Sequence, residues 1–292
     1  MALANGIRVP EPYSGHSLRN QMKSLSRRLE KKRQRLLQDY DAEHLHALRI
    51  TLRRMRSRLK QIPGKEARHL RRDLSVLAGA TNAARDWDTL VKSAGNLLPE
   101  EQFQQLAPWL EAEQKSARDR VTQMLQSEKW ASALKQWRHQ EKEHHQLREE
   151  TAGYAKHDLS RTLQELITAR DKALSRDDDK RWHKLRIAIK DLRYQLDATP
   201  KKKRSGGDRK ILALCKQLQV DLGEWHDTVV HAQLLDKIAF AGDPTRRAPP
   251  RDALESLQRA IAQRGSAQIQ QARSRLGQAE VLSVLMPPAE GV

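Results

Sequence analysis

The chain has 292 residues, of which 38% are hydrophobic and only 4% aromatic, and its formal net charge is +18. This composition suffices for helices that each bury one apolar stripe, and it contains no apolar run long enough to span a membrane. A single cysteine excludes an intrachain disulfide, and the first residues lack the apolar core of a signal peptide. We therefore expect a cytoplasmic protein with no membrane partner.

Ala, Leu, Gln, Glu, Lys and Arg dominate the sequence, which is typical of helices. Asp41 is the expected N-cap of the second helix, and Pro63-Gly64 is its expected end. A bend is expected near Gly79 in the third helix. The apolar spacing predicts helices over residues 17–39, 42–62, 65–95, 99–127, 152–175, 178–198, 207–240 and 251–284, with a short element from Trp130 to Trp137.

An eleven-residue motif occurs twice, first at His46 and again at His183. Five of its positions are identical in the two copies, and the copies begin 137 residues apart, nearly half of the chain. Such self-similarity indicates an internal duplication. The sequence thus predicts an all-α fold in one domain over 17–285. We expect this domain to consist of two pseudo-symmetric four-helix-bundle halves, 17–150 and 151–285, with irregular termini at 1–16 and 286–292.

Each copy, wound as a helix, places an apolar seam beside a cationic row, because residues three and four apart share a face. The seam of the first copy consists of Leu45, Leu48, Leu52, Met55, Leu59 and Ile62. Its basic row consists of His46, Arg49, Arg53, Arg56 and Lys60. The second copy has a seam of Trp182, Leu185, Ile189, Leu192 and Leu196, and a row of His183, Arg186, Lys190 and Arg193. An offset of one residue is about 100° around the axis, so each row flanks its seam at a predicted groove edge.

Positive charge is concentrated in three segments of the chain. Residues 41–72 contain ten lysines and arginines against three acids, and residues 180–216 contain thirteen against three. Residues 19–35 contain eight against one. Like charges this dense repel one another unless an anion compensates them, which favours a polyanionic ligand over ordinary solvated faces.

A second, weaker pair of motifs follows each copy. Arg85-Asp86-Trp87 follows the first, and His226-Asp227 follows the second, so that each aspartate lies about 40 residues after its motif histidine. We interpret these aspartates as structural braces that form ion pairs with the arginines, in preference to catalytic groups.

The motifs His-x-Leu-Arg-Ile-x-Leu-Arg-Arg-Met-Arg and His-x-Leu-Arg-Ile-x-Ile-Lys-x-Leu-Arg-Tyr resemble the paired signature of the CHAD family, the conserved-histidine α-helical domains. Arg85-Asp86-Trp87-Asp88 and Leu222-Gly223-x-x-His226-Asp227 resemble its later signatures. Asp191 and His226 depart from the family pattern. The resemblance covers about residues 17–285 and implies two helical bundles that bind inorganic polyphosphate along a basic surface. It implies this role for His46, Arg49, Arg53, Arg56, His183, Arg186, Lys190 and Arg193.

The residues themselves also suit a linear phosphate polymer, since arginine offers a planar fork of donors and lysine a mobile charge. We expect Lys23, Arg28, Arg54 and Lys60 to extend the site. The predicted function is non-enzymatic binding of polyphosphate in a basic groove formed by the two rows, with targeting to polyphosphate granules.

Two other functions remain open from the sequence. Basic helices also neutralise nucleic-acid backbones, although these rows lack the interleaved aromatic residues that stack on single strands. A phosphohydrolase or kinase would need a catalytic or metal site. We expect neither site and no cofactor, because the chain has no His-Glu-x-x-His motif, no pair of thiolate ligands and no phosphate-cradling glycine loop.

Overall fold

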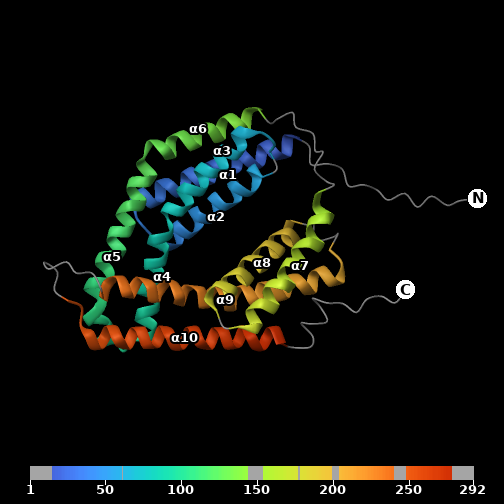
Figure 1. Cartoon of the computed structure of the whole chain (residues 1–292). Coiled ribbons are helices and arrows are strands. Elements are labelled where there is room, and N and C mark those ends of the chain that lie inside the picture. Colours follow the sequence, from blue (N-terminus) through green and yellow to red (C-terminus); the bar gives the residue numbers. More distant parts are fainter. Residues whose placement is uncertain are drawn as a thin grey trace, which may run out of the picture. The chain divides into compact units, whose positions relative to one another are not determined.

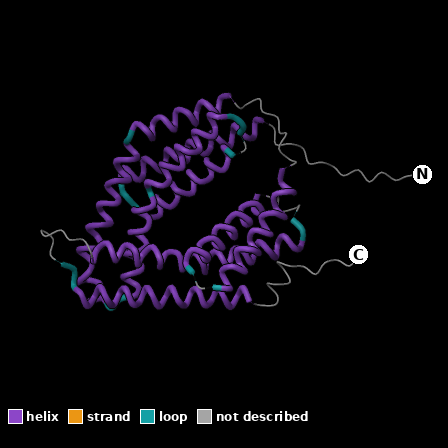
Figure 2. The backbone as a smooth tube through the Cα atoms, in the orientation of Figure 1, coloured by secondary structure: helices purple, strands orange, loops and turns teal. Residues whose placement is uncertain are grey.

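The computed structural model describes residues 15–60, 62–143, 154–176, 178–198, 204–239 and 248–277, and within them every regular element is an α-helix (Figure 1, Figure 2). The all-α fold class is therefore confirmed. None of these helices combines the length and the apolar character that crossing a bilayer requires. The helices of this part of the chain are α1 (Gly15–Gln38), α2 (Ala42–Leu59), α3 (Lys65–Ala80), α4 (Asn82–Leu97), α5 (Glu100–Gln126), α6 (Glu128–Glu143), α7 (Tyr154–Ser175), α8 (Asp179–Ala198), α9 (Gly206–Ala239) and α10 (Arg251–Gly277).

Two differences from the predicted helices have local physical causes. The single helix expected over 65–95 is wrong, because the chain breaks at Thr81 between α3 and α4. Thr81 is fully buried, and its hydroxyl donates to the carbonyl oxygen of Ala78 at 2.6 Å, which closes the end of α3. The short element expected around Trp130 and Trp137 is the longer helix α6, which buries both indole rings.

The chain divides into two compact units. Unit 1 contains Met1–Arg85 and Gln114–Ala152, and unit 2 contains Asp86–Glu113 and Gly153–Val292. The predicted halves differ from these units, because residues 86–113 group with the second one and the boundaries fall inside α4 and α5. That residues 17–150 and 151–285 are duplicated halves stays a prediction. The irregular termini expected at 1–16 and 286–292 lie outside the described residues, except that α1 already begins at Gly15.

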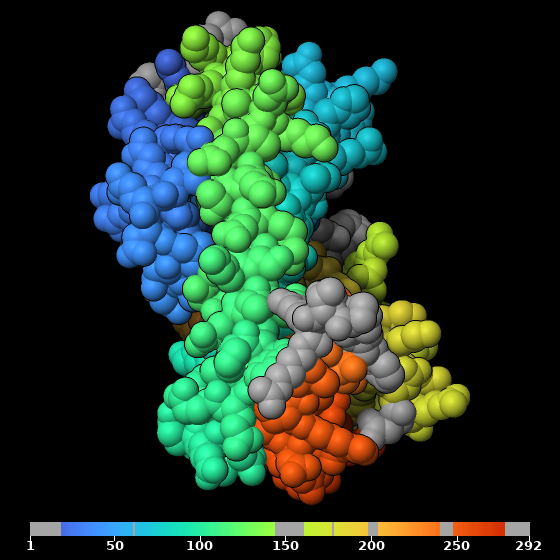
Figure 3. Space-filling model, turned by 90° about the vertical axis from the view of Figure 1, so that its left-hand side faces the viewer, coloured from blue at the N-terminus to red at the C-terminus, as the bar shows by residue number. Residues whose placement is uncertain are grey.

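Unit 1 packs α2 against α1 and α3, and α6 against α1 and α3. On one face of this unit, α6 lies between α1 and α3 (Figure 3). Buried Trp137 on α6 donates its indole N–H to the carbonyl oxygen of Met22 on α1 at 3.2 Å. Arg33 on α1 donates to the carbonyl oxygen of Leu125 at 2.7 Å, at the end of α5. These side-chain bonds join segments distant in sequence around one apolar core.

Unit 2 is built on α8 and α9, with α7 against α8 and α10 beside α9 (Figure 1). Its core cluster draws on all four helices and includes Leu166, Trp182, Leu218, Leu222 and Ala272. After the second motif helix the chain continues into one helix of 34 residues, α9, whereas two helices, α3 and α4, follow the first motif helix. Because α9 contacts both α8 and α10, it is buried on more than one face. A helix buried in this way does not need one continuous polar face.

The contact between α9 and α10 predicts opposite effects for two glycine substitutions. A Cβ at Gly265 would lie 2.6 Å from Oγ1 of Thr228, which itself donates to the carbonyl oxygen of Trp225. We expect Gly265→Ala to lower the free energy of unfolding by about 1–3 kcal/mol through overpacking. At Gly223, where an added Cβ meets nothing within 4 Å, alanine should raise it by roughly 0.5–1 kcal/mol. Chemical denaturation of both variants checks the pair, and a neutral or stabilising Gly265→Ala would contradict this packing.

Candidate functional site

Asp41 determines where the first cationic helix begins. Its Oδ1 accepts hydrogen bonds from the backbone N–H groups of Glu43 at 2.8 Å and His44 at 2.9 Å. The bond from His44 is the main cause that lowers the pKa of Asp41, so the carboxylate stays charged where the helix dipole favours an anion. The predicted N-cap is confirmed, and it sets the register of α2.

The seam predicted for the first copy is buried, with no member more than 3% exposed: Leu45, Leu48, Leu52, Met55, Leu59 and Ile62. The cationic row flanks this seam as expected. His46 and Arg53 are exposed, whereas Arg49 and Arg56 are half-buried at the edge of the core. The row therefore presents cations whose stems pack on apolar surface while their polar ends reach outward.

Arg49 is held at the break between α3 and α4. Its Nη1 donates to Oγ1 of Thr81 at 2.6 Å, to Oδ1 of Asn82 at 2.8 Å and to the carbonyl oxygen of Ala78 at 3.5 Å. A cation at a helix C-terminus is favoured by the helix dipole. These three oxygens are uncharged, so the bonds orient the guanidinium without cancelling its charge.

His46 lies in the positive field of this row. Burial is the first cause that lowers its pKa, followed by the charge of Arg85 and, more weakly, those of Arg53 and Arg49, while Glu43 opposes the shift. The imidazole is therefore neutral near pH 7. Three positive groups of unit 1, Arg85, Arg53 and Arg49, thus act on one small region around the motif histidine.

The second cationic helix is organised in the same way. Asp178 accepts a hydrogen bond from the backbone N–H of Lys180 at 2.9 Å, at the N-terminus of α8. The predicted seam is buried, with each member at most 1% exposed: Trp182, Leu185, Ile189, Leu192 and Leu196. The row itself is half-buried throughout: His183, Arg186, Lys190 and Arg193. This row is closer to the protein interior than its counterpart on α2.

His183 and His226 form the centre of the second row. Their ring centroids lie 5.1 Å apart with an interplanar angle of 46°. Burial first, and then the charges of Arg186, His183 and Lys190, lower the pKa of His226 to about 4. His226 is therefore a neutral imidazole surrounded by cations, which is the arrangement that an incoming anion would relieve.

The pKa of Arg186 is also shifted. Desolvation by burial lowers it, and the charge of Asp227 is the first cause that opposes this shift. The bracing role predicted for the second aspartate is supported by this attraction. Within the described residues, the buried Nε of Arg186 has no hydrogen-bond partner, and neither has that of Arg56 on α2. Each row thus retains a guanidinium N–H whose hydrogen bond is unmade.

The end of the second row is less available to a ligand. Arg193 donates to Oε1 of Gln219, and its Nε lies 3.3 Å from a carboxylate oxygen of Asp197. Asp197 also pairs with Arg204 at 3.8 Å. An ion pair of this kind offsets part of the charge of Arg193, so the field is strongest around His183 and Arg186.

The secondary site residues are dispersed over two helices. Lys23 and Arg28 are exposed on α1, and Arg54 is exposed on α2 with Lys60 at its C-cap. No hydrogen bond or ion pair among the described residues connects Lys23 or Arg28 with the α2 row. The two rows belong to different units, and the single groove expected from the sequence stays a prediction.

Two residues close to the motif histidines were absent from the predicted site. Arg85 acts on His46, and His226 stacks against His183. Both directly precede the aspartates of the second motif pair, Asp86 and Asp227. The repeated position could have identified both residues. The sequence does not reveal, however, that Arg85 on α4 lies near His46 or that His226 on α9 lies near His183.

The comparisons with known proteins agree on one fold. The family model of the CHAD domain matches residues 20–236. A crystal structure of the CHAD domain from the plant Ricinus communis is similar with a TM-score of 0.72 at 22% identity, covering 97% of this chain and 96% of the other. The structure of PptA from Streptomyces chartreusis has a TM-score of 0.60 at 15% identity, covering 92% and 99%. No curated protein matches the chain.

The depressed pKa values predict that acid destabilises the fold. His226 and buried His231, whose Nε2 lies 3.1 Å from Oγ1 of Thr89, have folded pKa values of about 4 against an ordinary 6.5. The folded state then binds fewer protons than the unfolded chain, so stability is fully present above about pH 6.5 and declines as pH falls toward 4. Chemical denaturation at about pH 7 and about pH 5 should show this loss. His226→Gln and His231→Gln should each reduce it, and an unchanged pH dependence in both variants would contradict the assignment.

Proposed function

The chain belongs to the CHAD domain family, and from this membership we propose that it binds inorganic polyphosphate through the cationic rows of α2 and α8 without acting as an enzyme. The observation that carries the proposal is the cluster around His226. Burial is the first cause that depresses its pKa, and the charges of Arg186, His183 and Lys190 act in the same direction, so positive groups converge on this imidazole. Such a cluster is stabilised by an anion.

The spacing of the rows favours a polymer over a small anion. Consecutive cations of a row are separated by one turn of helix, and a row from histidine to last arginine spans roughly 15 Å. A linear polyphosphate carries charge on every unit and can therefore contact several members of a row at once. Arginine forks and lysine point charges both suit phosphate oxygens.

Binding without cleavage would concentrate the protein wherever polyphosphate accumulates, and targeting to polyphosphate granules is the cellular role that we propose. Nucleic acid is the rival ligand, because its phosphate backbone satisfies the same cations. Tighter binding of duplex DNA than of long-chain polyphosphate in a competition titration near physiological salt would refute the proposal. Shortening of the polyphosphate during incubation with metal ions would instead favour a phosphohydrolase.

Removing one exposed or half-buried cation from each row should weaken the complex. We expect Arg53→Gln combined with Lys190→Gln to reduce polyphosphate affinity by roughly a hundredfold or more, since each lost charged hydrogen bond costs about 1.5–3 kcal/mol. The slope of log affinity against log salt should also become shallower by about one to two.

The matched control for this double variant removes the same charge elsewhere. Arg68→Gln on α3 and Lys216→Gln on α9 change exposed side chains outside the rows, one in each unit. This control should retain most of the affinity of the unmodified protein. Equal losses in the two double variants would mean that binding follows net charge and that the rows are not the site.

Polyphosphate binding should be coupled to proton uptake. The free protein holds the pKa of His46 low and that of His226 at about 4, and a bound polyanion would raise both. The bound state then carries more protons, so affinity should increase as pH falls from about 7.5 toward 5.5. Calorimetry in two buffers of different ionisation enthalpy measures the uptake directly. In His46→Gln/His226→Gln the uptake should be largely lost, and its persistence would exclude these two groups.

A further inference from the structure

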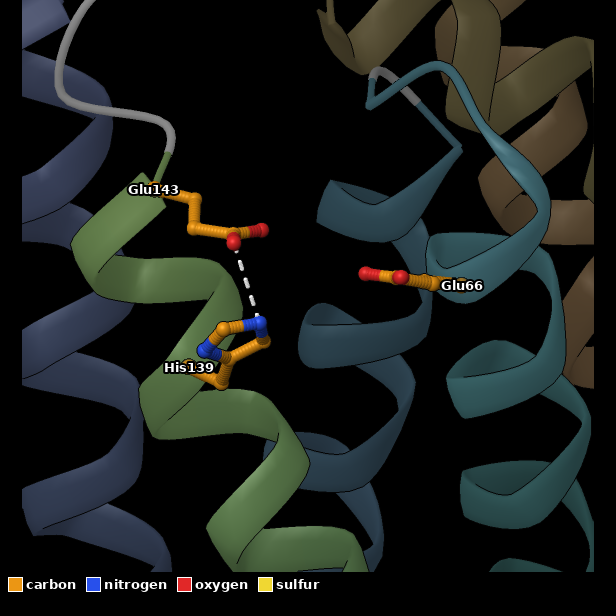
Figure 4. A group of neighbouring side chains, drawn as sticks. All are labelled: Glu66, His139 and Glu143. Atoms are coloured by element: carbon orange, nitrogen blue, oxygen red, sulfur yellow. Dashed lines mark ion pairs between the residues drawn. The ribbon is translucent and has the colours of Figure 1, made fainter.

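Three potential metal ligands converge on one face of unit 1, apart from the cationic rows. Glu66 comes from the first turn of α3, and His139 and Glu143 are one turn apart on α6. One donor atom from each residue lies within 4.8 Å of the other two. Figure 4 shows the carboxylate of Glu66 pointing across the space between the helices toward the other two side chains.

The buried neighbour Gln140 orients one of these ligands. Gln140 is 3% exposed, and its amide donates to Oε2 of Glu66 at 3.2 Å. The carboxylate of Glu66 is thereby held toward α6, with its other oxygen available. Hydrogen-bonded support of this kind is what fixes the orientation of metal-binding carboxylates.

The cluster is electrostatically unfavourable without a cation. Two carboxylates held this close repel each other, and His139 contacts only one of them as an ion pair, with Nε2 at 3.0 Å from Oε1 of Glu143. Glu143 and His139 are about half exposed, so each side chain could turn away into water. Their convergence on Glu66, whose carboxylate Gln140 holds in place, is therefore the feature on which a metal site can be built.

We propose that Glu66, His139 and Glu143 form a binding site for a divalent transition-metal ion of the zinc type. Nε2 of His139 and one oxygen from each glutamate would be the three protein ligands, with water in the remaining position. An imidazole with two carboxylates suits zinc, whereas magnesium and calcium prefer oxygen ligands alone. Donor atoms around tetrahedral zinc lie about 3.3 Å apart, a contraction that rotation of the exposed glutamate side chains supplies.

Metal binding at this site joins α3 to α6 and so stabilises unit 1. The site lies outside the two motif copies, and it does not depend on polyphosphate binding. No metal site was expected, because the chain has no His-Glu-x-x-His motif and no pair of thiolate ligands. These three ligands form no such motif, since 73 residues separate Glu66 from His139 and only His139 and Glu143 are near neighbours in the chain.

The test is a titration of the full, tag-free and metal-stripped chain with ZnCl₂ in the absence of polyphosphate. We expect one saturable site by calorimetry and an increase in melting temperature on zinc addition, with magnesium unable to compete. Glu66→Gln, which keeps an acceptor for Gln140, and His139→Gln should each weaken zinc affinity by roughly tenfold or more.

Two controls separate this site from general surface binding. Glu128→Gln removes the same charge from the other end of α6 and should bind zinc as the unmodified chain does. His144→Gln/His145→Gln removes the adjacent histidines that follow α6 and should also leave binding intact. Non-saturable binding, unchanged affinity in Glu66→Gln, or loss of binding in the histidine double variant would overturn the proposal while leaving the polyphosphate proposal unaffected.

Discussion

The offset of one residue between an apolar seam and a cationic row is the constraint on which the rest of the structure depends. Burial of the seam draws each row against the core, because its members are attached to the same helix about 100° away. Leu185 and Ile189 are fully buried, and Arg186 and Lys190 beside them are half-buried as a direct consequence. The hydrophobic effect thus holds positive charges closer together than they would lie in a freely solvated chain.

Two histidines at the cationic rows have lowered pKa values. His226 remains deprotonated among cations, and His46 is shifted in the same direction. Arg49 is anchored by uncharged oxygens at the end of α3, so its position is fixed while its charge is retained. Arg193, at the end of the second row, forms an ion pair with Asp197. This pair offsets charge at the end of the row more than around His183 and Arg186. Positive potential is therefore preserved where a polyanion is proposed to bind.

The two copies of the motif are used differently. His46 on α2 is exposed and lies near exposed Arg53 and half-buried Arg49, and the break between α3 and α4 at Thr81 gives Arg49 its anchor. On α8, the row is more deeply placed against the long uninterrupted α9, which brings His226 to His183. Unit 1 also carries the Glu66, His139 and Glu143 cluster between α3 and α6. The two motif copies thus form similar rows, and the helices around them make their electrostatic environments unequal.

The sequence by itself determined the helical class, the two buried seams, the N-cap Asp41 and the register of both rows, because each depends on residues within about four positions of one another. The resemblance carried by the repeated motif was sufficient to identify the family. Only the tertiary structure decided that the chain breaks at Thr81, that Arg85 and His226 return to the motif histidines, and that Glu66 meets His139. These features depend on which helices pack together and at what depth, and no local pattern of residues encodes the distance between side chains that lie 39, 43 or 73 positions apart in the sequence.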